Sequence, residues 1–218
     1  MAALLARLTA DPSFSLIEQC PASEVLVRNG RVEGIRTPAG AHYANAVVVA
    51  AGAWSGDWLA PLGLELPVQP VKGQMQLYRC AAGWLPSMVL FNGRYAIPRR
   101  DGHVLIGSTL EHSGFDASTT AAGFASLRQS AIQLLPHLAT QAPVGQWAGL
   151  RPGSPDGVPF IGEVPGVSGL WLNAGHYRNG LVLAPASCRL AADLIIGRAP
   201  VIDPQPYDPA QRLSPAQC

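Results

Sequence analysis

The chain has 218 residues, of which 13% are charged and 48% hydrophobic, and its formal net charge is +1. That length is enough for one large domain or two small ones with a sizeable core. The absence of a basic stripe excludes a dedicated nucleic-acid-binding surface. The apolar content excludes intrinsic disorder everywhere except in the proline-rich tail, residues 199–218.

The expected location is the cytoplasm. The four cysteines form no Cys-x-x-Cys pair, which is typical of reduced thiols rather than of a disulfide frame or a zinc site; they are Cys20, Cys80, Cys188 and Cys218. The histidines also lack metal-ligand spacing, so we expect no metal. Residues 1–12 are too short and too interrupted for a signal peptide. The longest apolar helix, 180–197, carries Arg189 and Asp193, and we therefore expect a soluble protein without a membrane partner.

The first third of the chain reads as a short helix followed by strands. The helix covers residues 2–8, and its abrupt start suggests that a further segment preceded it. Strands are expected over 14–20, 24–40 and 41–50, with tight turns at Asn29-Gly30 and Ala39-Gly40. The apolar run 46–50 is typical of a parallel strand buried on both faces. A short helix is expected over 54–64.

From Pro67 the pattern changes to alternating, antiparallel strands. They are expected over 67–80, 87–92, 94–109 and 144–152. One amphipathic helix, 118–138, interrupts them, with candidate apolar positions Leu127, Ile132, Leu134 and Leu135. Short strands over 158–164 and 169–175 then lead to the helix 180–197. The order is a nucleotide-domain-like piece, an antiparallel piece, and a return to the first.

Several catalytic signatures are absent from the printed sequence. It contains no G-x-G-x-x-G, no P-loop, no His-Glu-x-x-His and no G-x-S-x-G elbow. Asp156 and Glu163 could pair as catalytic carboxylates. An Asp in a Ser-Pro-Asp-Gly turn is more often structural, and we favour that interpretation.

Two segments are ambiguous when taken alone. Residues 47–55, VVVAAGAWS, open a buried strand into small residues, where a ligand can approach the backbone, although an ordinary turn is the simpler interpretation. Arg151 lies between a strand end and a Pro/Gly-rich turn. A buried arginine either pairs internally or binds an anion, and this segment favours neither.

The segment 173–180 favours a ligand site. Asn179 or Gly180 would cap a helix whose first N–H groups lack partners, and the helix dipole attracts negative charge there. Gly175 and Gly180 let a flat ring lie against the backbone, and Arg178 adds a fixed positive charge. A plain cap explains only one of four polar side chains, which are His176, Tyr177, Arg178 and Asn179.

Together these segments resemble one family. The runs that carry the resemblance are VVVAAGAWS, PVKGQM, YAIPRRDGHVLIGST, WAGLRPGSPDGVPFIG and AGHYRNGLVLAPAS. They are similar to the C-terminal portion of FAD-dependent glycine oxidases of the D-amino-acid oxidase family, which are tied to thiamine biosynthesis. The resemblance covers 21–197. It implies an α/β (mixed α+β) fold with a partial, Rossmann-like FAD domain (1–66 and 152–198), an antiparallel substrate domain (67–151) and a tail (199–218).

The resemblance also implies roles for individual residues. The substrate carboxylate would bind Arg151, with Tyr95 as a second contact and Arg178 facing the substrate. Leu110 would stand in the substrate pocket at a variable position. The FAD contacts would be Ala22, Ala51, Gly52, Trp54, Gly175, His176, Tyr177, Arg178, Asn179, Gly180, Leu181 and Val182. The helix dipole would stabilise the negative charge of the reduced flavin, and hydride loss from a neutral amine would need no tuned general base.

The implied reaction is oxidative deamination of glycine, sarcosine or a small D-amino acid by FAD, with oxygen as acceptor and hydrogen peroxide as product. The chain departs from the family by lacking the G-x-G-x-x-G that holds the FAD pyrophosphate. One alternative is a D-amino-acid dehydrogenase that passes electrons to a carrier, against which the motif 175–180 argues. Another is a non-catalytic remnant or binding module. Under any of these interpretations, the protein partner expected for the chain is a second copy of itself or a missing N-terminal half.

Overall fold

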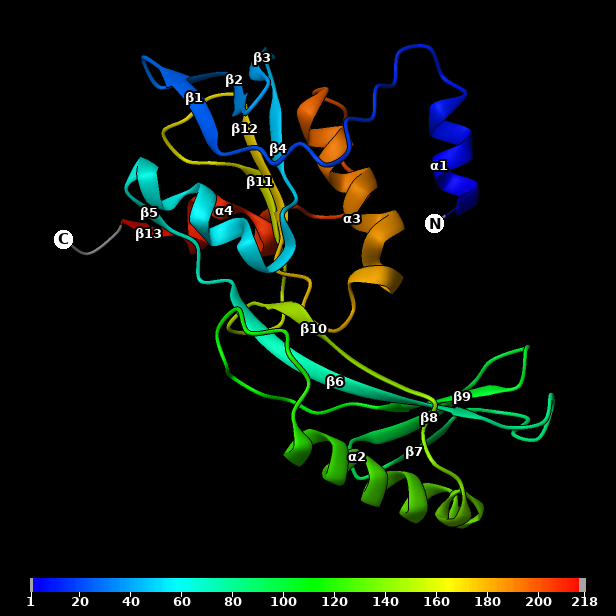
Figure 1. Cartoon of the computed structure of the whole chain (residues 1–218). Coiled ribbons are helices and arrows are strands. Elements are labelled where there is room, and N and C mark those ends of the chain that lie inside the picture. The colour runs from blue at the N-terminus through cyan, green and yellow to red at the C-terminus, as the bar shows by residue number, and fades with distance from the viewer. Residues whose placement is uncertain (1, 216–218) are drawn as a thin grey trace.

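The computed structural model describes residues 2–215, which form two lobes (Figure 1). The upper lobe contains residues 2–68 and 154–215, and the lower lobe contains residues 69–153. Two long strands, β6 (Gln69–Arg79) and β10 (Gly145–Gly153), begin and end at the junction and pair along their whole length. The expected domain limits at 66/67 and 151/152 remain a prediction, although the chain passes from one lobe to the other within a few residues of each limit.

Two three-stranded sheets build the upper lobe. The first is a meander of β1 (Glu24–Arg28), β2 (Arg31–Thr37) and β3 (Gly40–Tyr43). Asn29 and Gly30 have φ of 50° and 70°, as a two-residue hairpin turn requires, so the predicted turn is confirmed. The second sheet has the order β11 (Phe160–Glu163), β12 (Leu170–Ala174) and β4 (Val47–Val49). Strand β4 runs parallel to β12, also as predicted.

The helices of the upper lobe differ in how closely they pack against the sheet. α3 (Gly180–Ile195) packs on β11 and β12, whereas α1 (Ala2–Thr9) has no buried residue and stands apart in Figure 1. The predicted helix over 54–64 is instead two 3₁₀ helices, η1 (Gly52–Trp58) and η2 (Ala60–Leu62). Pro61 and the left-handed Gly63 end them, because neither residue suits a continuing α-helix.

Two strand predictions in this lobe are wrong. Residues 14–20 form no strand, because no described strand lies beside them and Ile17 faces solvent. Residues 41–50 are broken between β3 and β4. Strand β4 is not buried on both faces, since Val49 is buried but Val48 is 44% exposed. Among the described strands only β12 pairs with β4, which leaves its other edge open.

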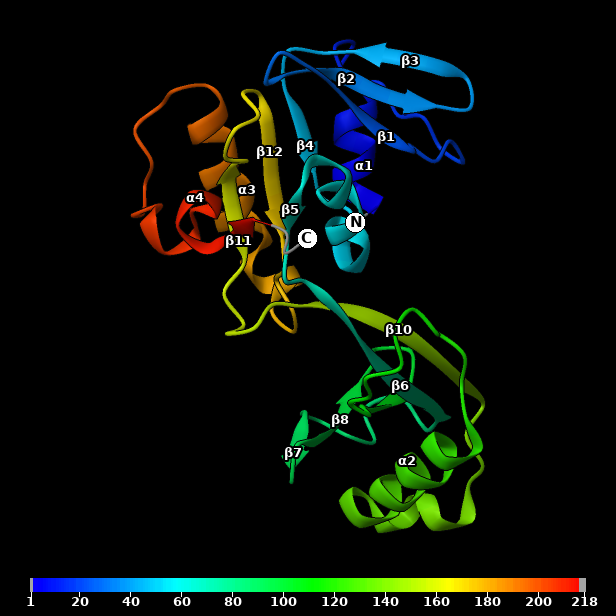
Figure 2. The same ribbon diagram turned by 90° about the vertical axis from the view of Figure 1, so that its left-hand side faces the viewer.

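The lower lobe is one antiparallel sheet covered on one face by a helix (Figure 2). Its order is β10-β6-β9-β8-β7, where β7 is Val89–Phe91, β8 is Arg94–Pro98 and β9 is His103–Gly107. Helix α2 (Ala121–Leu134) packs with Leu127 fully buried. Gln76 donates to the carbonyl of Phe124 in α2 at 2.9 Å. Side chains alternate along a strand, so the odd-numbered residues of β6 lie on the opposite, open face.

The helix predicted over 118–138 is shorter than expected. It begins at the cap Thr120 and ends at Leu134, and a 3₁₀ helix, η3 (Pro136–Thr140), follows. Pro136 has no backbone N–H and cannot continue the α-helix. Leu134 and Leu135 pack partly buried against the core of this lobe, and Ile132 is half-buried.

The proline-rich tail is ordered as far as residue 215, which contradicts the expectation of disorder there. It forms η4 (Gln205–Tyr207), α4 (Pro209–Arg212) and β13 (Ser214–Pro215), which pairs with β5 (Leu64–Glu65). Arg212 donates to the carbonyls of Pro159 and Val158 and to the Asp156 carboxylate, and its guanidinium lies 4.0 Å from the Phe160 ring centroid. This one side chain joins the tail to the upper lobe.

We therefore expect Arg212→Ala to lower the free energy of unfolding by about 1.5–3 kcal/mol, the range for a lost hydrogen bond to a charged group. Chemical denaturation of both proteins measures the difference. Arg100→Ala is the matched control, because Arg100 is exposed and makes no hydrogen bond or ion pair with a described residue. Equal stability of the two variants would contradict this function of Arg212.

Three further observations concern the described residues. No helix within residues 2–215 is long and apolar enough to cross a membrane. No group of three or more His, Cys, Asp or Glu side chains in that range is arranged to hold a metal ion. Cys20, Cys80 and Cys188 are free thiols, and Cys218 lies outside the described residues.

Candidate functional site

Arg151 lies on the open face of the lower sheet. It is half-buried on β10, and its Nη2 donates to the Ser108 Oγ at 2.6 Å. Its guanidinium covers Gly73 of the neighbouring strand β6. No carboxylate of residues 2–215 lies within 4.0 Å of the Arg151 guanidinium. Of the two interpretations the sequence allows, the internal ion pair is therefore wrong, and the charge remains free to bind an anion.

Tyr95 lies on the same face, two strands away from β6. It pairs with Gly107 of β9, and its ring covers the Gly107 Cα. Its hydroxyl makes no hydrogen bond with any described residue. Because Ser108 follows Gly107 directly, the residue under Tyr95 and the residue that holds Arg151 are neighbours in the chain. The structure thus brings together the two predicted carboxylate contacts.

Leu110 completes this part of the face. Lys72 and Glu111 form an antiparallel bridge, which places Leu110 beside Gly73. The Glu111 carboxylate accepts from Gln74 on the α2 side, and alternation therefore points Leu110 to the open face. Leu110 is 54% exposed, and its position in a substrate pocket remains a prediction.

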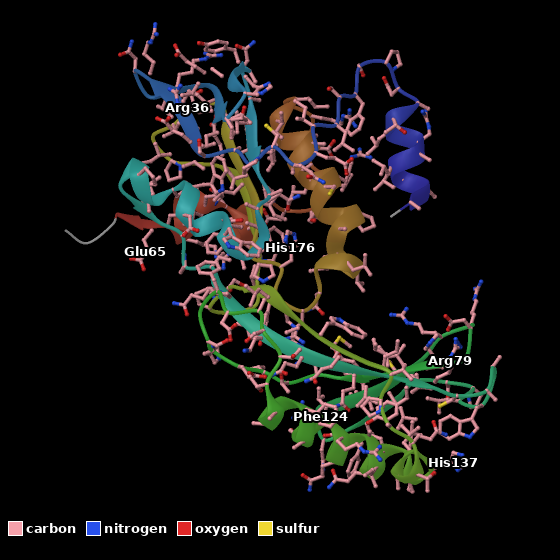
Figure 3. The ribbon with its side chains drawn as sticks, viewed as in Figure 1. Arg36, Glu65, Arg79, Phe124, His137 and His176 are labelled. Carbon is pink, nitrogen blue, oxygen red and sulfur yellow. The ribbon has the colours of Figure 1, made fainter. Side chains whose placement is uncertain are left out.

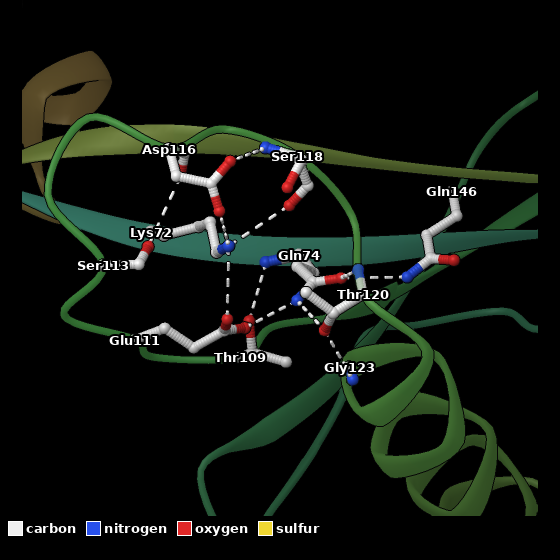
Figure 4. A network of polar contacts seen from close by, with 10 residues as sticks. All are labelled: Lys72, Gln74, Thr109, Glu111, Ser113, Asp116, Ser118, Thr120, Gly123 and Gln146. Carbon is white, nitrogen blue, oxygen red and sulfur yellow. Dashed lines mark hydrogen bonds and ion pairs between the residues drawn. The ribbon is translucent and has the colours of Figure 1, made fainter.

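A polar network on the opposite face, built around the buried Lys72 and Gln74, fixes the segment that carries these residues (Figure 4). Lys72 is buried, and its Nζ donates to Asp116 at 2.8 Å and to the Ser118 carbonyl at 3.2 Å. This contact holds the pKa of the Asp116 carboxyl far below its usual range. Gln74 donates to Glu111 and to Thr120, the cap of α2. Segment 109–118 is thereby tied both to β6 and to α2.

The second part of the site lies where the parallel strands of the upper lobe end. Strands β4 and β12 run in the same direction, so Ala51-Gly52 and Ala174-Gly175 lie at one edge of the sheet. Ligands bind at this edge of open α/β sheets. Both glycines have positive φ, 58° at Gly52 and 79° at Gly175. The loop after β12 is anchored to β10, because the Tyr177 N–H donates to the Pro152 carbonyl at 2.8 Å.

That loop leads into the N-terminus of α3, whose donors are free. Asn179 is the N-cap residue, but its side chain makes no capping hydrogen bond. The backbone N–H groups of residues 180–182 donate to no described residue. Arg178 is exposed, and Leu181 and Val182 are 83% and 84% exposed. A positive helix end flanked by an arginine and by bare apolar side chains suits an anionic, flat ligand.

His176 lies where the two lobes meet (Figure 3). Its Nε2 is buried without a hydrogen-bond partner among the described residues. Burial lowers the pKa of His176 below its usual 6.5. A buried polar atom without a partner costs free energy, and this one lies beside the α3 N-terminus, where a ligand could supply the partner.

The His176 shift has a consequence for stability. Burial disfavours the protonated form only in the folded state, so the unfolded chain binds more protons between pH 6.5 and the lowered pKa. Stability is therefore expected to fall as the pH drops through this window. Urea unfolding at a series of pH values should show a weaker pH dependence for His176→Gln. The control His112→Gln, at an exposed position, should keep the wild-type pH dependence; the same weakening there would contradict the assignment.

Ala22 and Trp54 line a pocket of their own, although the Trp54 N–H donates to the carbonyl of Ala51, another predicted site residue, at 3.1 Å. Both line a pocket of about 620 Å³ between β1 and the 3₁₀ helices, and the lining includes neither Arg151, Tyr95 nor any of residues 175–182. Trp54 does contact the lower lobe, because its ring stacks on Phe115 with centroids 5.6 Å apart. Of the predicted contacts, Ala22 is therefore the one found only in this pocket, whereas Trp54 joins the pocket to Ala51 and Gly52 at the sheet edge.

Asp156 and Glu163 do not form a catalytic pair. Asp156 binds Arg212, and Glu163 accepts from the Gly169 N–H at 2.7 Å. The sequence interpretation missed the contact of Ser108 with Arg151. No local signal could have revealed it, because the contact depends on the pairing of β9 with β6 and of β6 with β10.

The fold has two lobes, one of which presents a helix N-terminus with free donors, and the other an arginine without a carboxylate partner among residues 2–215. The chain belongs to the family of FAD dependent oxidoreductases (DAO), whose sequence profile matches residues 1–194. The mixed sheets described above are the fold of this family.

Individual relatives agree with this assignment. A glycine oxidase of Pseudomonas aeruginosa is 63% identical over 96% of this chain, and the chain covers 58% of that protein. The bifunctional protein ThiO/ThiG of Synechocystis is 40% identical over 78% of the chain, which covers 26% of it. The crystal structure of glycine oxidase from Geobacillus kaustophilus matches with a TM-score of 0.87 and 35% identity, over 95% of this chain and 56% of that one. The chain thus spans about half the length of the glycine oxidases it matches, between 46% and 58% of each sequence.

Proposed function

We propose that the chain carries the substrate-anchoring half of an FAD-dependent amine oxidase site, together with part of its flavin site. The substrate is glycine or a similarly small amine, such as sarcosine or a small D-amino acid. The single observation that carries the proposal is Arg151, a half-buried arginine without a carboxylate partner in residues 2–215, on an open face. The similarity to glycine oxidases, and to ThiO/ThiG with its link to thiamine biosynthesis, supports the choice of substrate and pathway.

Arg151 binds the substrate carboxylate. A guanidinium presents two parallel N–H groups to two carboxylate oxygens, and such a charge-assisted pair is stronger than a neutral contact. Tyr95, whose hydroxyl has no partner among the described residues, donates to the same carboxylate, and Arg178 lies on the substrate side of the α3 N-terminus. Holding the carboxylate fixes the amine and the α-carbon in one orientation, which accounts for much of the rate gain in such reactions.

The flavin half of the site fits FAD in part. The free N–H groups of residues 180–182, the unpartnered Nε2 of His176 and the glycines 52 and 175 suit an electron-rich ring edge. When bound, FAD would accept the hydride (one proton with two electrons) that leaves the α-carbon, while the amine nitrogen loses a proton. The positive end of α3 stabilises negative charge that develops at this edge. The sequence has no glycine-rich cradle for the FAD pyrophosphate, so these residues hold only one end of the cofactor.

The test is amine-dependent formation of hydrogen peroxide. The chain is joined behind the N-terminal segment of the P. aeruginosa glycine oxidase, loaded with FAD, and assayed with glycine, sarcosine and D-alanine in a peroxidase-coupled reaction. Peroxide formation with glycine that is lost in Arg151→Ala is the expected result. Amine oxidation that proceeds only with an artificial electron carrier would instead support a D-amino-acid dehydrogenase. No oxidation in an enzyme that retains FAD would support a non-catalytic binding module.

A further inference from the structure

Gly73 and Gly149 are cross-strand partners on the open face, and Gly107 lies on the same face of the next strand, opposite Met75. Gly73 and Gly107 lie directly under the proposed carboxylate contacts. Gly73 lies under the Arg151 guanidinium, and Gly107 lies under the Tyr95 ring. We propose that Gly73 and Gly107 are positioning residues, whose missing side chains let Arg151 and Tyr95 lie flat on the sheet and reach one carboxylate together. This inference rests on the proposed function and adds two residues to it.

The Arg151 guanidinium lies directly above Gly73. A Cβ built at Gly73 would contact Nη1 and Nη2 of Arg151 and lie 2.5 Å from its Cζ, and these three atoms are the nearest of all. Real Cβ atoms essentially never approach a heavy atom so closely, so the guanidinium would have to move. Because it is the far end of a flexible side chain, it can move without disturbing the backbone. A methyl group at Gly73 would therefore displace the charge and spare the fold.

The same geometry recurs at Gly107. A Cβ there would lie 2.6 Å from Cε2, 2.7 Å from Cζ and 2.7 Å from the hydroxyl oxygen of Tyr95. Neither Gly73 nor Gly107 has a positive φ, so the strand backbone itself does not require glycine at either position. Glycine is instead required by the side chains above them, Arg151 and Tyr95.

Gly149 is the matched control. It is the cross-strand partner of Gly73 and lies on the same face, and it also lacks a positive φ. A Cβ at Gly149 would meet nothing within 4 Å. Gly149→Ala thus makes the same chemical change in the same row of the sheet without touching Arg151.

Moving the guanidinium has two consequences for binding. It breaks or lengthens the hydrogen bond from Nη2 to Ser108, which orients the planar guanidinium. It also turns the two N–H donors of Arg151 away from the carboxylate that Arg151 and Tyr95 are proposed to bind together. A bidentate contact depends on this orientation. Loss of one hydrogen bond to a charged group weakens binding by about tenfold.

The experiment uses the 218-residue chain itself. The Arg151 Nε–Hε signal is assigned in ¹⁵N NMR spectra by its loss in Arg151→Lys, and glycolate, a carboxylate without an amine, is titrated. In the wild type and in Gly149→Ala, the signal should keep one position and glycolate should bind with the same affinity. In Gly73→Ala the signal should shift and the Kd for glycolate should rise about tenfold, with an unchanged melting temperature. Gly107→Ala should move the Tyr95 ring signals instead.

Each other outcome is decisive. A wild-type Arg151 signal and wild-type glycolate affinity in Gly73→Ala would overturn the proposal, as would equal effects in Gly149→Ala. If Gly73→Ala does not fold, adding Arg151→Ala should restore folding, because the three atoms nearest to the new Cβ all belong to Arg151; failure to restore it would count against the inference. Should glycolate not bind the wild type at all, the proposed carboxylate site fails, while the Arg151 signal alone still decides whether Gly73 positions the guanidinium.

Discussion

In an FAD-loaded enzyme that contains this chain, Arg151→Ala is expected to lower kcat/KM for glycine by at least about tenfold. Hydrogen bonds to charged groups contribute roughly 1.5–3 kcal/mol, and each 1.4 kcal/mol is about tenfold. Tyr95→Phe removes a neutral contact of about 0.5–1.5 kcal/mol and should cost about tenfold or less. We expect Arg151 to be the larger anchor, because its charge has no carboxylate partner among residues 2–215.

The value of kcat should fall together with kcat/KM. If the carboxylate contact holds the α-carbon in place, its loss removes orientation as well as affinity. Steady-state kinetics and thermal unfolding on the same Arg151→Ala protein separate this function from a structural one. Normal kinetics combined with a lower melting temperature would reject the anchor. Arg100→Ala, at an exposed surface position, controls for the loss of one positive charge.

The chain alone is expected to bind FAD weakly or not at all. The printed sequence contains no G-x-G-x-x-G, and in dinucleotide-binding folds this motif supplies backbone hydrogen bonds and a helix N-terminus to the pyrophosphate. The groups available here are the α3 N-terminus and the pocket lined by Ala22 and Trp54, which lie in separate places. Together they would contact parts of FAD but not its pyrophosphate, the most highly charged group of the cofactor.

Fluorescence titration and gel filtration measure this binding. FAD added to the purified chain should keep the fluorescence of the free cofactor, and the protein should elute colourless. The P. aeruginosa glycine oxidase, treated identically, serves as the positive control. A yellow chain that retains stoichiometric FAD through gel filtration would show that the missing cradle is not needed.

The elements that the sequence predicted well are those with strong local signals. Asn29-Gly30 encodes a two-residue hairpin turn, and the alternation after Pro67 encodes the antiparallel sheet. The errors occurred where local signals were overridden. Residues 14–20 alternate like a strand but have no partner strand beside them in the described part of the chain, and the tail is ordered by Arg212, whose four contacts lie far away in the sequence.

The site residues also fall into those that local sequence predicts and those that depend on the fold. The α3 N-terminus was predictable, because its polar residues and glycines are contiguous between positions 173 and 180. Whether Arg151 was free or paired could not be predicted, because that depends on every carboxylate the fold brings near it. Ser108, Gly73 and Gly107 were also out of reach, since their contacts form only when β10, β6, β9 and β8 align in register.

The most direct test of the central claim is a crystal structure of the completed enzyme with FAD and glycolate bound. If the open face and the α3 N-terminus are two walls of one site, the glycolate carboxylate should contact Arg151 and Tyr95, and the flavin ring should lie against residues 175–182. Glycolate bound away from Arg151, or a flavin ring that does not contact the N-terminus of α3, would contradict it.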